Sequence, residues 1–239
     1  MLLPLIFLQR KFHRELQAIV LILTTRADVT MVVFSLIFFP GVLLHELSHY
    51  LVAKLLFVPT GGFSLIPRSM PNGTLRLGYV EVSKTDLLRD SIIGAAPLIA
   101  GGLFVSYAAV YQLELRPLWD ALRMANFPVF WAGFFNLPNV PDFWLWAYLT
   151  FAVSSTMLPS ESDRHAWLPL MGVIGVLLAV AILAGAGVWL LDNLAPPLNT
   201  FFRSVATIFG LSAAAHGLFL LPLLLLHKGA TRLTGRDIQ

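Results

Sequence analysis

Two histidines and a glutamate stand close together in the stretch PGVLLHELSHYLVAKLL, residues 40–56. His45 and His49 are four residues apart, so on an α-helix both imidazoles lie on one face, one turn apart, where they can hold a single zinc ion. Glu46 lies about 100° further round the helix, from where it can reach a zinc-bound water without being a ligand. This is the H-E-x-x-H pattern, in which the glutamate acts as the general base of peptide hydrolysis.

A simpler explanation of this motif is a structural polar cluster, or a site that has lost its metal. A histidine at membrane depth often only hydrogen-bonds to a neighbouring helix. The chain, however, has only six histidines in 239 residues, and an ionisable residue inside the bilayer costs about 2.5–3.5 kcal/mol on insertion scales. Because packing alone does not explain that cost for Glu46, we favour a zinc site with Zn²⁺ as cofactor.

A catalytic zinc normally has three protein ligands and a water, so the motif needs a third ligand from elsewhere. The chain has no cysteine, which restricts that ligand to a nitrogen or an oxygen. The candidates are Asp142, Asp163, His165 and His216. We favour Asp163, since it follows the apolar stretch 143–158 at the end that returns to the depth of the motif, whereas Asp142 precedes that stretch at its other end. His165 and His216 stay as alternatives, and Asp163 could instead cap the next helix.

The composition indicates that these residues lie in an integral membrane protein. Hydrophobic residues make up 57% of the chain and charged residues 12%, and the mean hydropathy is +0.78, outside the range of soluble domains. Several stretches approach the roughly 20 apolar residues that a membrane-spanning helix needs. They are residues 29–58, 91–113, 143–158, 166–191 and 204–227.

Two further regions are apolar but interrupted. Residues 9–25 begin with several charges, which is typical of a helix that lies at the membrane interface. Residues 118–141 contain three prolines and two charges, and we interpret them as interfacial or re-entrant. We therefore predict an all-α polytopic protein with about five to six transmembrane helices. It would form a single domain, 1–239, with a core at about 29–165, an N-terminal helix in 1–28, and two transmembrane helices and a cytoplasmic tail in 166–239.

The one convincing β signal lies between the first two predicted spans, in residues 63–82. Asn72-Gly73 supplies the positive φ angles of a tight hairpin turn. Apolar side chains alternate along the second strand at Leu75, Leu77 and Tyr79. We predict a small membrane-associated β-hairpin with one apolar face; the simpler alternative is an ordinary loop.

The basic residues indicate which way the motif faces. They are concentrated in the loop after the first span and in the C-terminal tail, so both segments should face the cytoplasm. Lys54 marks the cytoplasmic end of the motif helix, and a rise of 1.5 Å per residue places His49 about 7–8 Å below it. The net charge of +3 is scattered rather than gathered in a stripe, which argues against binding to nucleic acid.

These residues resemble the site-2 protease family of intramembrane zinc metalloproteases. The resemblance rests on HELSH (45–49) in a membrane helix, on the hairpin, and on the later stretch TMLPSESD (156–163) with its aspartate. In that family the aspartate lies in a pattern like N-x-x-P-x-x-x-L-D-G; here Thr156 stands where asparagine is usual and Ser162 precedes the aspartate. The resemblance implies zinc held by His45, His49 and Asp163.

The resemblance also implies a reaction and a partner. Glu46 would be the catalytic base, and the substrate would be a transmembrane or membrane-proximal protein with a segment that unwinds easily, since a helical backbone hides its carbonyls. The hairpin would offer an edge strand to that segment, with Leu75, Leu77 and Tyr79 in contact with it. The expected location is the plasma membrane of a prokaryote, with the site towards the cytoplasm.

Two other classes of function compete with a protease. One is a non-proteolytic, pseudoprotease-like protein that binds membrane segments; metal content separates it from the first. The other is a transporter, which would need ionisable residues at successive depths along several spans. The stretches 91–113 and 166–191 are nearly free of such residues, so we rank a transporter last.

Overall fold

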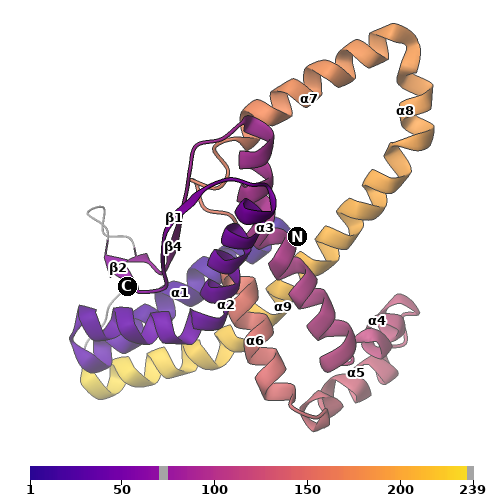
Figure 1. Cartoon of the computed structure of the whole chain (residues 1–239). Coiled ribbons are helices and arrows are strands. Elements are labelled where there is room, and N and C mark those ends of the chain that lie inside the picture. Colours follow the sequence, from indigo (N-terminus) through magenta and orange to yellow (C-terminus); the bar gives the residue numbers. More distant parts are fainter. Residues whose placement is uncertain (70–74, 236–239) are drawn as a thin grey trace.

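The computed structural model describes residues 1–69 and 75–235, without the side chains of 68–76, and this part of the chain is mainly helical (Figure 1). The helices are α1 (Leu2–Thr24), α2 (Ala27–Leu55), α3 (Leu87–Tyr107), α4 (Arg116–Arg123), α5 (Phe127–Asn136), α6 (Phe143–Thr156), α7 (Trp167–Ala181), α8 (Gly187–Asn193) and α9 (Ala195–Thr234). The prediction of an all-α fold with a small β element is confirmed at this level.

The number of helices long enough to cross a membrane is smaller than predicted. Among the described residues, four helical segments are long and apolar enough: Ala27–Leu55, Leu87–Gln112, Trp167–Asn193 and Ala195–Thr234. The prediction of five to six was therefore wrong. The stretch 143–158 forms only the 14-residue α6, which at 1.5 Å per residue is about 21 Å long and falls short of the roughly 30 Å hydrocarbon core.

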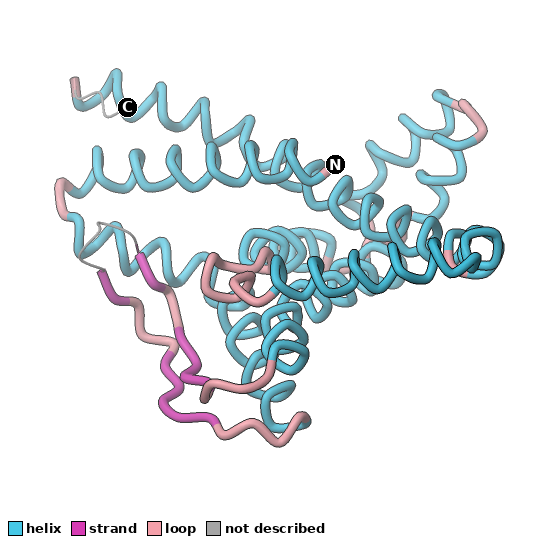
Figure 2. The backbone as a smooth tube through the Cα atoms, turned by 90° about the horizontal axis from the view of Figure 1, so that it is seen from above, coloured by secondary structure: helices cyan, strands magenta, loops and turns pink. Residues whose placement is uncertain are grey.

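The charged N-terminal helix packs between two other helices. Figure 2 shows α1 side by side with α2 and with the C-terminal part of α9, and α1 lies between the two. Its apolar face is buried through residues such as Leu5, Phe12 and Ile22. Glu15, also buried, pairs with His227 of α9. One charged residue of α1 is therefore paired with a side chain of α9.

Helices α2 and α6 cross at very close range, and a glycine makes this possible. A Cβ atom added at Gly41 would stand 2.2 Å from the carbonyl oxygen of Ala152 and 2.4 Å from Oγ1 of Thr156. Aromatic rings fill the space next to this crossing, with the ring centroids of Phe12 and Phe151 4.6 Å apart. Gly41 therefore lets the last turns of α6 approach the motif helix.

The β element consists of two short antiparallel ladders. Strand β1 (Thr60–Ser64) pairs with β4 (Tyr79–Val82), and β2 (Arg68–Ser69) pairs with β3 (Leu75–Arg76). The predicted hairpin is thus present, and its ladder begins at Thr60. The predicted turn at Asn72-Gly73 lies outside the described residues.

The remaining helices surround this core unevenly. Residues 118–141 form α4, α5 and a short 3₁₀ turn, none of them long enough to span a bilayer. Figure 1 shows α7 and α8 extending away from the other helices. They join through a π-helical segment in which Gly185 has φ of 90°, a left-handed conformation that favours glycine. None of the most apolar window of Trp167–Asn193 is buried, so this segment has the exposure expected of a lipid-facing helix.

Candidate metal centre

The two histidines of the motif lie together on one face of α2, as their spacing predicted. Their ring centroids are 4.9 Å apart and the two Nε2 atoms are 3.3 Å apart. His49 is buried and His45 is nearly so, with 14% of its side chain exposed. One turn of a continuous helix therefore presents two imidazole nitrogens to the same point.

Backbone carbonyls fix the orientation of both rings. Nδ1 of His45 donates to the carbonyl oxygen of Thr156 at 2.7 Å, and Nδ1 of His49 donates to that of Ile93 at 2.9 Å. Because a carbonyl can only accept, both Nδ1 atoms carry the hydrogen, and in the neutral rings both Nε2 atoms have a free lone pair. Metal-binding histidines are typically held in this way.

Asp163 completes the group from the loop between α6 and α7. Its Oδ1 lies 3.4 Å from Nε2 of His49, and its Oδ2 lies 3.8 Å from Nε2 of His45. The backbone N–H and the hydroxyl of Ser160 donate to Oδ2 at 2.7 and 2.6 Å. Burial alone would raise the pKa of the Asp163 carboxyl, but the nearby His49 ring and the hydrogen bonds from Ser160 outweigh burial and hold that pKa well below its usual range. Asp163 is therefore an ionised carboxylate.

The three side chains have the geometry of a metal site. Their ligand atoms all lie within 4.8 Å of one another, so the group could hold a metal ion. Ligands bound tetrahedrally at about 2.0–2.1 Å stand about 3.3–3.4 Å apart, which is close to the 3.3 and 3.4 Å separations around Nε2 of His49. With neutral rings, the convergence of two lone pairs and a carboxylate is unfavourable unless a cation lies between them.

One turn of α3 positions both ligand-bearing segments. Ile93 supplies the carbonyl that holds His49, and the next residue, Gly94, lies directly against the aspartate loop. A Cβ atom added at Gly94 would stand 2.0 Å from the backbone oxygen of Asp163. The indole N–H of Trp167 donates to the carbonyl of Ser91 at 3.3 Å. The α6–α7 loop thus contacts α3 at Asp163 and again at Trp167, the first residue of α7.

Gly94→Ala is expected to displace Asp163 and to lower metal affinity by about 10- to 100-fold, the range found when the support of a ligand is lost. The matched control is Gly102→Ala on the same helix, where the added Cβ would make an ordinary contact of 3.6 Å with Ile208. Chelator competition on the two purified variants measures the effect. Equal affinities would show that the close approach at Gly94 does not position the aspartate.

Glu46 is buried beside the histidines, on the side of α2 that the β element covers. Its residue exposure is 8%, and a Cβ added at Gly78 would stand 2.9 Å from its Cγ. The backbone just before β4 therefore passes directly over the glutamate. A side chain at position 78 would collide with the residue that we expect to be the general base.

The other candidate ligands lie elsewhere. His165 is exposed and pairs with Asp90 at 2.8 Å. His216 is fully buried, but it hydrogen-bonds to Ser155 and to the carbonyl of Ser212. Asp142 opens α6, with no side-chain capping hydrogen bond. The alternative that Asp163 caps the next helix also fails, since α7 begins after Ala166 with no side-chain cap.

The predicted substrate-contacting residues are placed differently from one another. Leu77 packs partly against the hydrophobic cluster that contains Phe12 and Phe38. Tyr79 begins β4 opposite Ser64, and Leu75 pairs with Ser69 in the second ladder. Contact of Leu75, Leu77 and Tyr79 with a substrate stays a prediction.

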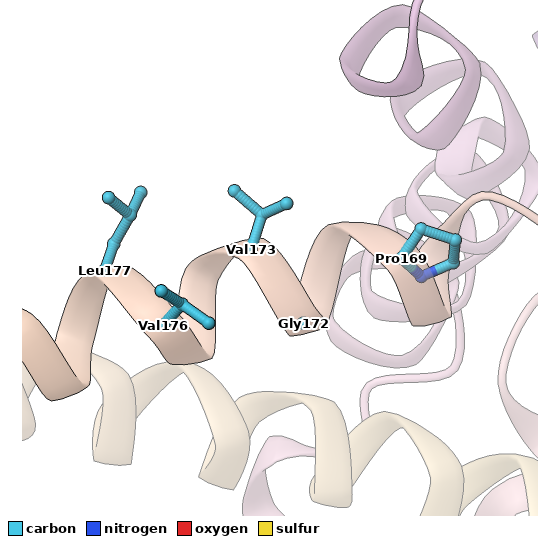
Figure 3. Close-up of a pocket in the computed structure, with 5 residues that line it drawn as sticks. All are labelled: Pro169, Gly172, Val173, Val176 and Leu177. Carbon is cyan, nitrogen blue, oxygen red and sulfur yellow. The ribbon is translucent and has the colours of Figure 1, made fainter.

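Sequence reasoning missed the groups that support the ligands. The carbonyls of Thr156 and Ile93 carry no side-chain signal, so no residue type could have revealed them. Ser160 could have been found, because a serine three residues before an aspartate often closes a local turn. An apolar hollow on α7, lined by Pro169, Gly172, Val173, Val176 and Leu177, shares no residue with the metal group and offers no side chain for chemistry (Figure 3).

The fold and the site together define a class: a mainly α-helical protein with helices long and apolar enough to cross a membrane and a histidine–histidine–aspartate group that could bind a metal. No protein-family model matches the chain, and neither a curated protein nor a solved structure matches it.

Proposed function

We propose that this protein is a membrane-embedded zinc metalloprotease in which His45, His49 and Asp163 bind the metal and Glu46 is the general base. One observation carries the proposal: three acceptor atoms converge on one point, next to a buried glutamate, in an H-E-x-x-H helix. Two imidazoles and one carboxylate are the ligand set of catalytic zinc in thermolysin-type hydrolases, which leave the fourth position to water.

Zinc fits this group better than other common metals. Calcium and magnesium prefer sites made mainly of oxygen atoms, whereas imidazole favours zinc and later transition metals. The ligand spacing of 3.3–3.8 Å suits a four-coordinate ion. The carbonyls behind both rings keep Nε2 free for the metal, as in other histidine-bound zinc sites.

When bound, zinc would lower the pKa of its water towards neutrality and polarise the scissile carbonyl. Glu46 takes a proton from the attacking water while the water oxygen bonds to the carbonyl carbon. Glu46 then gives that proton to the amine nitrogen as the C–N bond breaks. The Thr156 and Ile93 carbonyls hold the two rings in place, so the ligands need not reorganise during the reaction.

The substrate class follows from where the group lies. His45 and His49 belong to a helix apolar enough to cross a membrane, so the peptide bond must come from a transmembrane or membrane-proximal segment. Such a segment must unwind before its carbonyls can be attacked. We place the metal towards the cytoplasm because basic residues are frequent in the loop after α2, and the resemblance to site-2 proteases implies the plasma membrane of a prokaryote.

The test combines metal content with cleavage. Protein purified in detergent is expected to contain about one zinc per chain and to cut tagged single-span reporters whose segments contain glycine or proline, but not reporters with polyleucine segments. Stripping the metal with 1,10-phenanthroline should stop cleavage, and added zinc should restore it. Bound zinc without cleavage of any reporter would favour the non-proteolytic, segment-binding alternative, and a protein that binds no zinc would refute the proposal.

A further inference from the structure

A fully buried polar pair joins α6 to α9 at the residue before the one whose carbonyl holds His45. It consists of His216 of α9, with no exposed surface, and Ser155 of α6, with 2% exposed. Nδ1 of His216 donates to the carbonyl of Ser212 at 2.7 Å, so its Nε2 is the acceptor for the Ser155 hydroxyl at 2.9 Å. The pair is thus fully hydrogen-bonded and has one defined tautomer.

This pair acts on the last turn of α6, where backbone carbonyls lack partners within the helix. The carbonyl of Ser155 accepts a hydrogen bond from the side-chain amide of Gln9 in α1. The carbonyl of the next residue, Thr156, accepts from Nδ1 of His45. Two consecutive free carbonyls are therefore used, one to fasten α6 to α1 and the other to orient a ligand of the metal group.

The orientation of the His45 ring depends on the position of the Thr156 carbonyl, because Nδ1 of His45 donates to that carbonyl. Thr156 is the final residue of α6, and beyond it the chain turns into the loop of Asp163. The position of that carbonyl therefore depends on what fixes the end of α6. His216 of α9 and Gln9 of α1 both hydrogen-bond to Ser155, the residue immediately before Thr156.

We propose that His216 is a positioning residue for the metal centre: by holding Ser155 it fixes the Thr156 carbonyl, and through that carbonyl the orientation of His45. This inference rests on the proposed function, since it requires a metal at His45. It gives His216 a role in the site without making it a ligand.

The test measures cobalt(II) bound in place of zinc, because its visible absorption reports ligand geometry. His216→Ala is expected to change that spectrum and to weaken zinc binding about 10-fold, at the low end of the effect of losing support for a ligand. His216→Gln keeps an acceptor near Ser155 and should restore much of both. Ser155→Ala removes the same link without touching His216 and should reproduce the alanine variant, so the test survives if His216→Ala does not fold.

His13 provides the matched control. It lies on α1, and its buried Nε2 has no hydrogen-bond partner, so His13→Ala removes an imidazole from the same region without breaking a link to α6. Its cobalt spectrum should match the wild type. A wild-type protein that binds no cobalt or zinc would refute the proposed function. A metal-binding protein with unchanged spectra and affinities in His216→Ala and Ser155→Ala, or with equal losses in His13→Ala, would overturn the positioning role alone.

Discussion

Glu46→Gln is expected to leave zinc bound and to reduce peptide hydrolysis by at least about 10²- to 10⁴-fold, the contribution of a general base. Glutamine has nearly the same shape as glutamate, so it can keep the close contact with the backbone at Gly78. It cannot take a proton from water at neutral pH. Reporter cleavage and metal content, measured on the same preparation, separate loss of the base from loss of the site.

Glu15→Gln is the matched control for this change. Glu15 is the same residue type and is equally buried, at 8% exposed, but it pairs with His227 of α9 and is not part of the metal group. It should keep both zinc and cleavage. If Glu46→Gln still cut reporters at the wild-type rate, the proton would have to go elsewhere and the assignment of the base would be lost.

The spacing of HELSH was enough to predict the ring arrangement, because an α-helix has only one way to place residues four apart. Asp163 was also chosen correctly over Asp142 as the partner in space, since the two lie at opposite ends of one apolar stretch. That choice depended on the stretch 143–158 returning the chain to the depth of the motif, and the short α6 does bring Asp163 to His49.

The length of α6 shows what periodicity cannot supply. Residues 143–158 are mainly apolar, yet the helix stops at Thr156. Its last two residues are held by tertiary hydrogen bonds, to Gln9 and His216 at Ser155 and to His45 at Thr156. Backbone groups that bind at a helix end leave no mark in residue type, so hydropathy alone extended the stretch into a span.

The role of His216 shows the same limit. From sequence it was a possible ligand, because any histidine can bind zinc. In the structure its two nitrogens are already occupied, by Ser155 and by the carbonyl of Ser212. The residue type correctly indicated a nitrogen able to accept a bond. Only the three-dimensional contacts could show that both nitrogens of His216 already have hydrogen-bond partners.

Asp163→Ala is expected to remove the metal almost completely. Loss of a supporting group costs about 10- to 100-fold in affinity, and loss of a ligand itself should cost more than that. The two histidines that are left would bind zinc with too few protein ligands for a catalytic site. Ser160 would keep its N–H and hydroxyl without the carboxylate that they now bind. Zinc content after dialysis against a weak chelator measures the loss.

Two substitutions test whether this loss is specific to Asp163. Asp142→Ala removes the carboxylate at the other end of α6. His165→Ala removes the exposed histidine two residues after Asp163, which pairs with Asp90. Both should keep wild-type zinc, because neither side chain belongs to the group around His45 and His49. If zinc survived in Asp163→Ala and was lost in His165→Ala, the loop would have to turn by two residues on binding metal, and the group seen here would not be the ligand set.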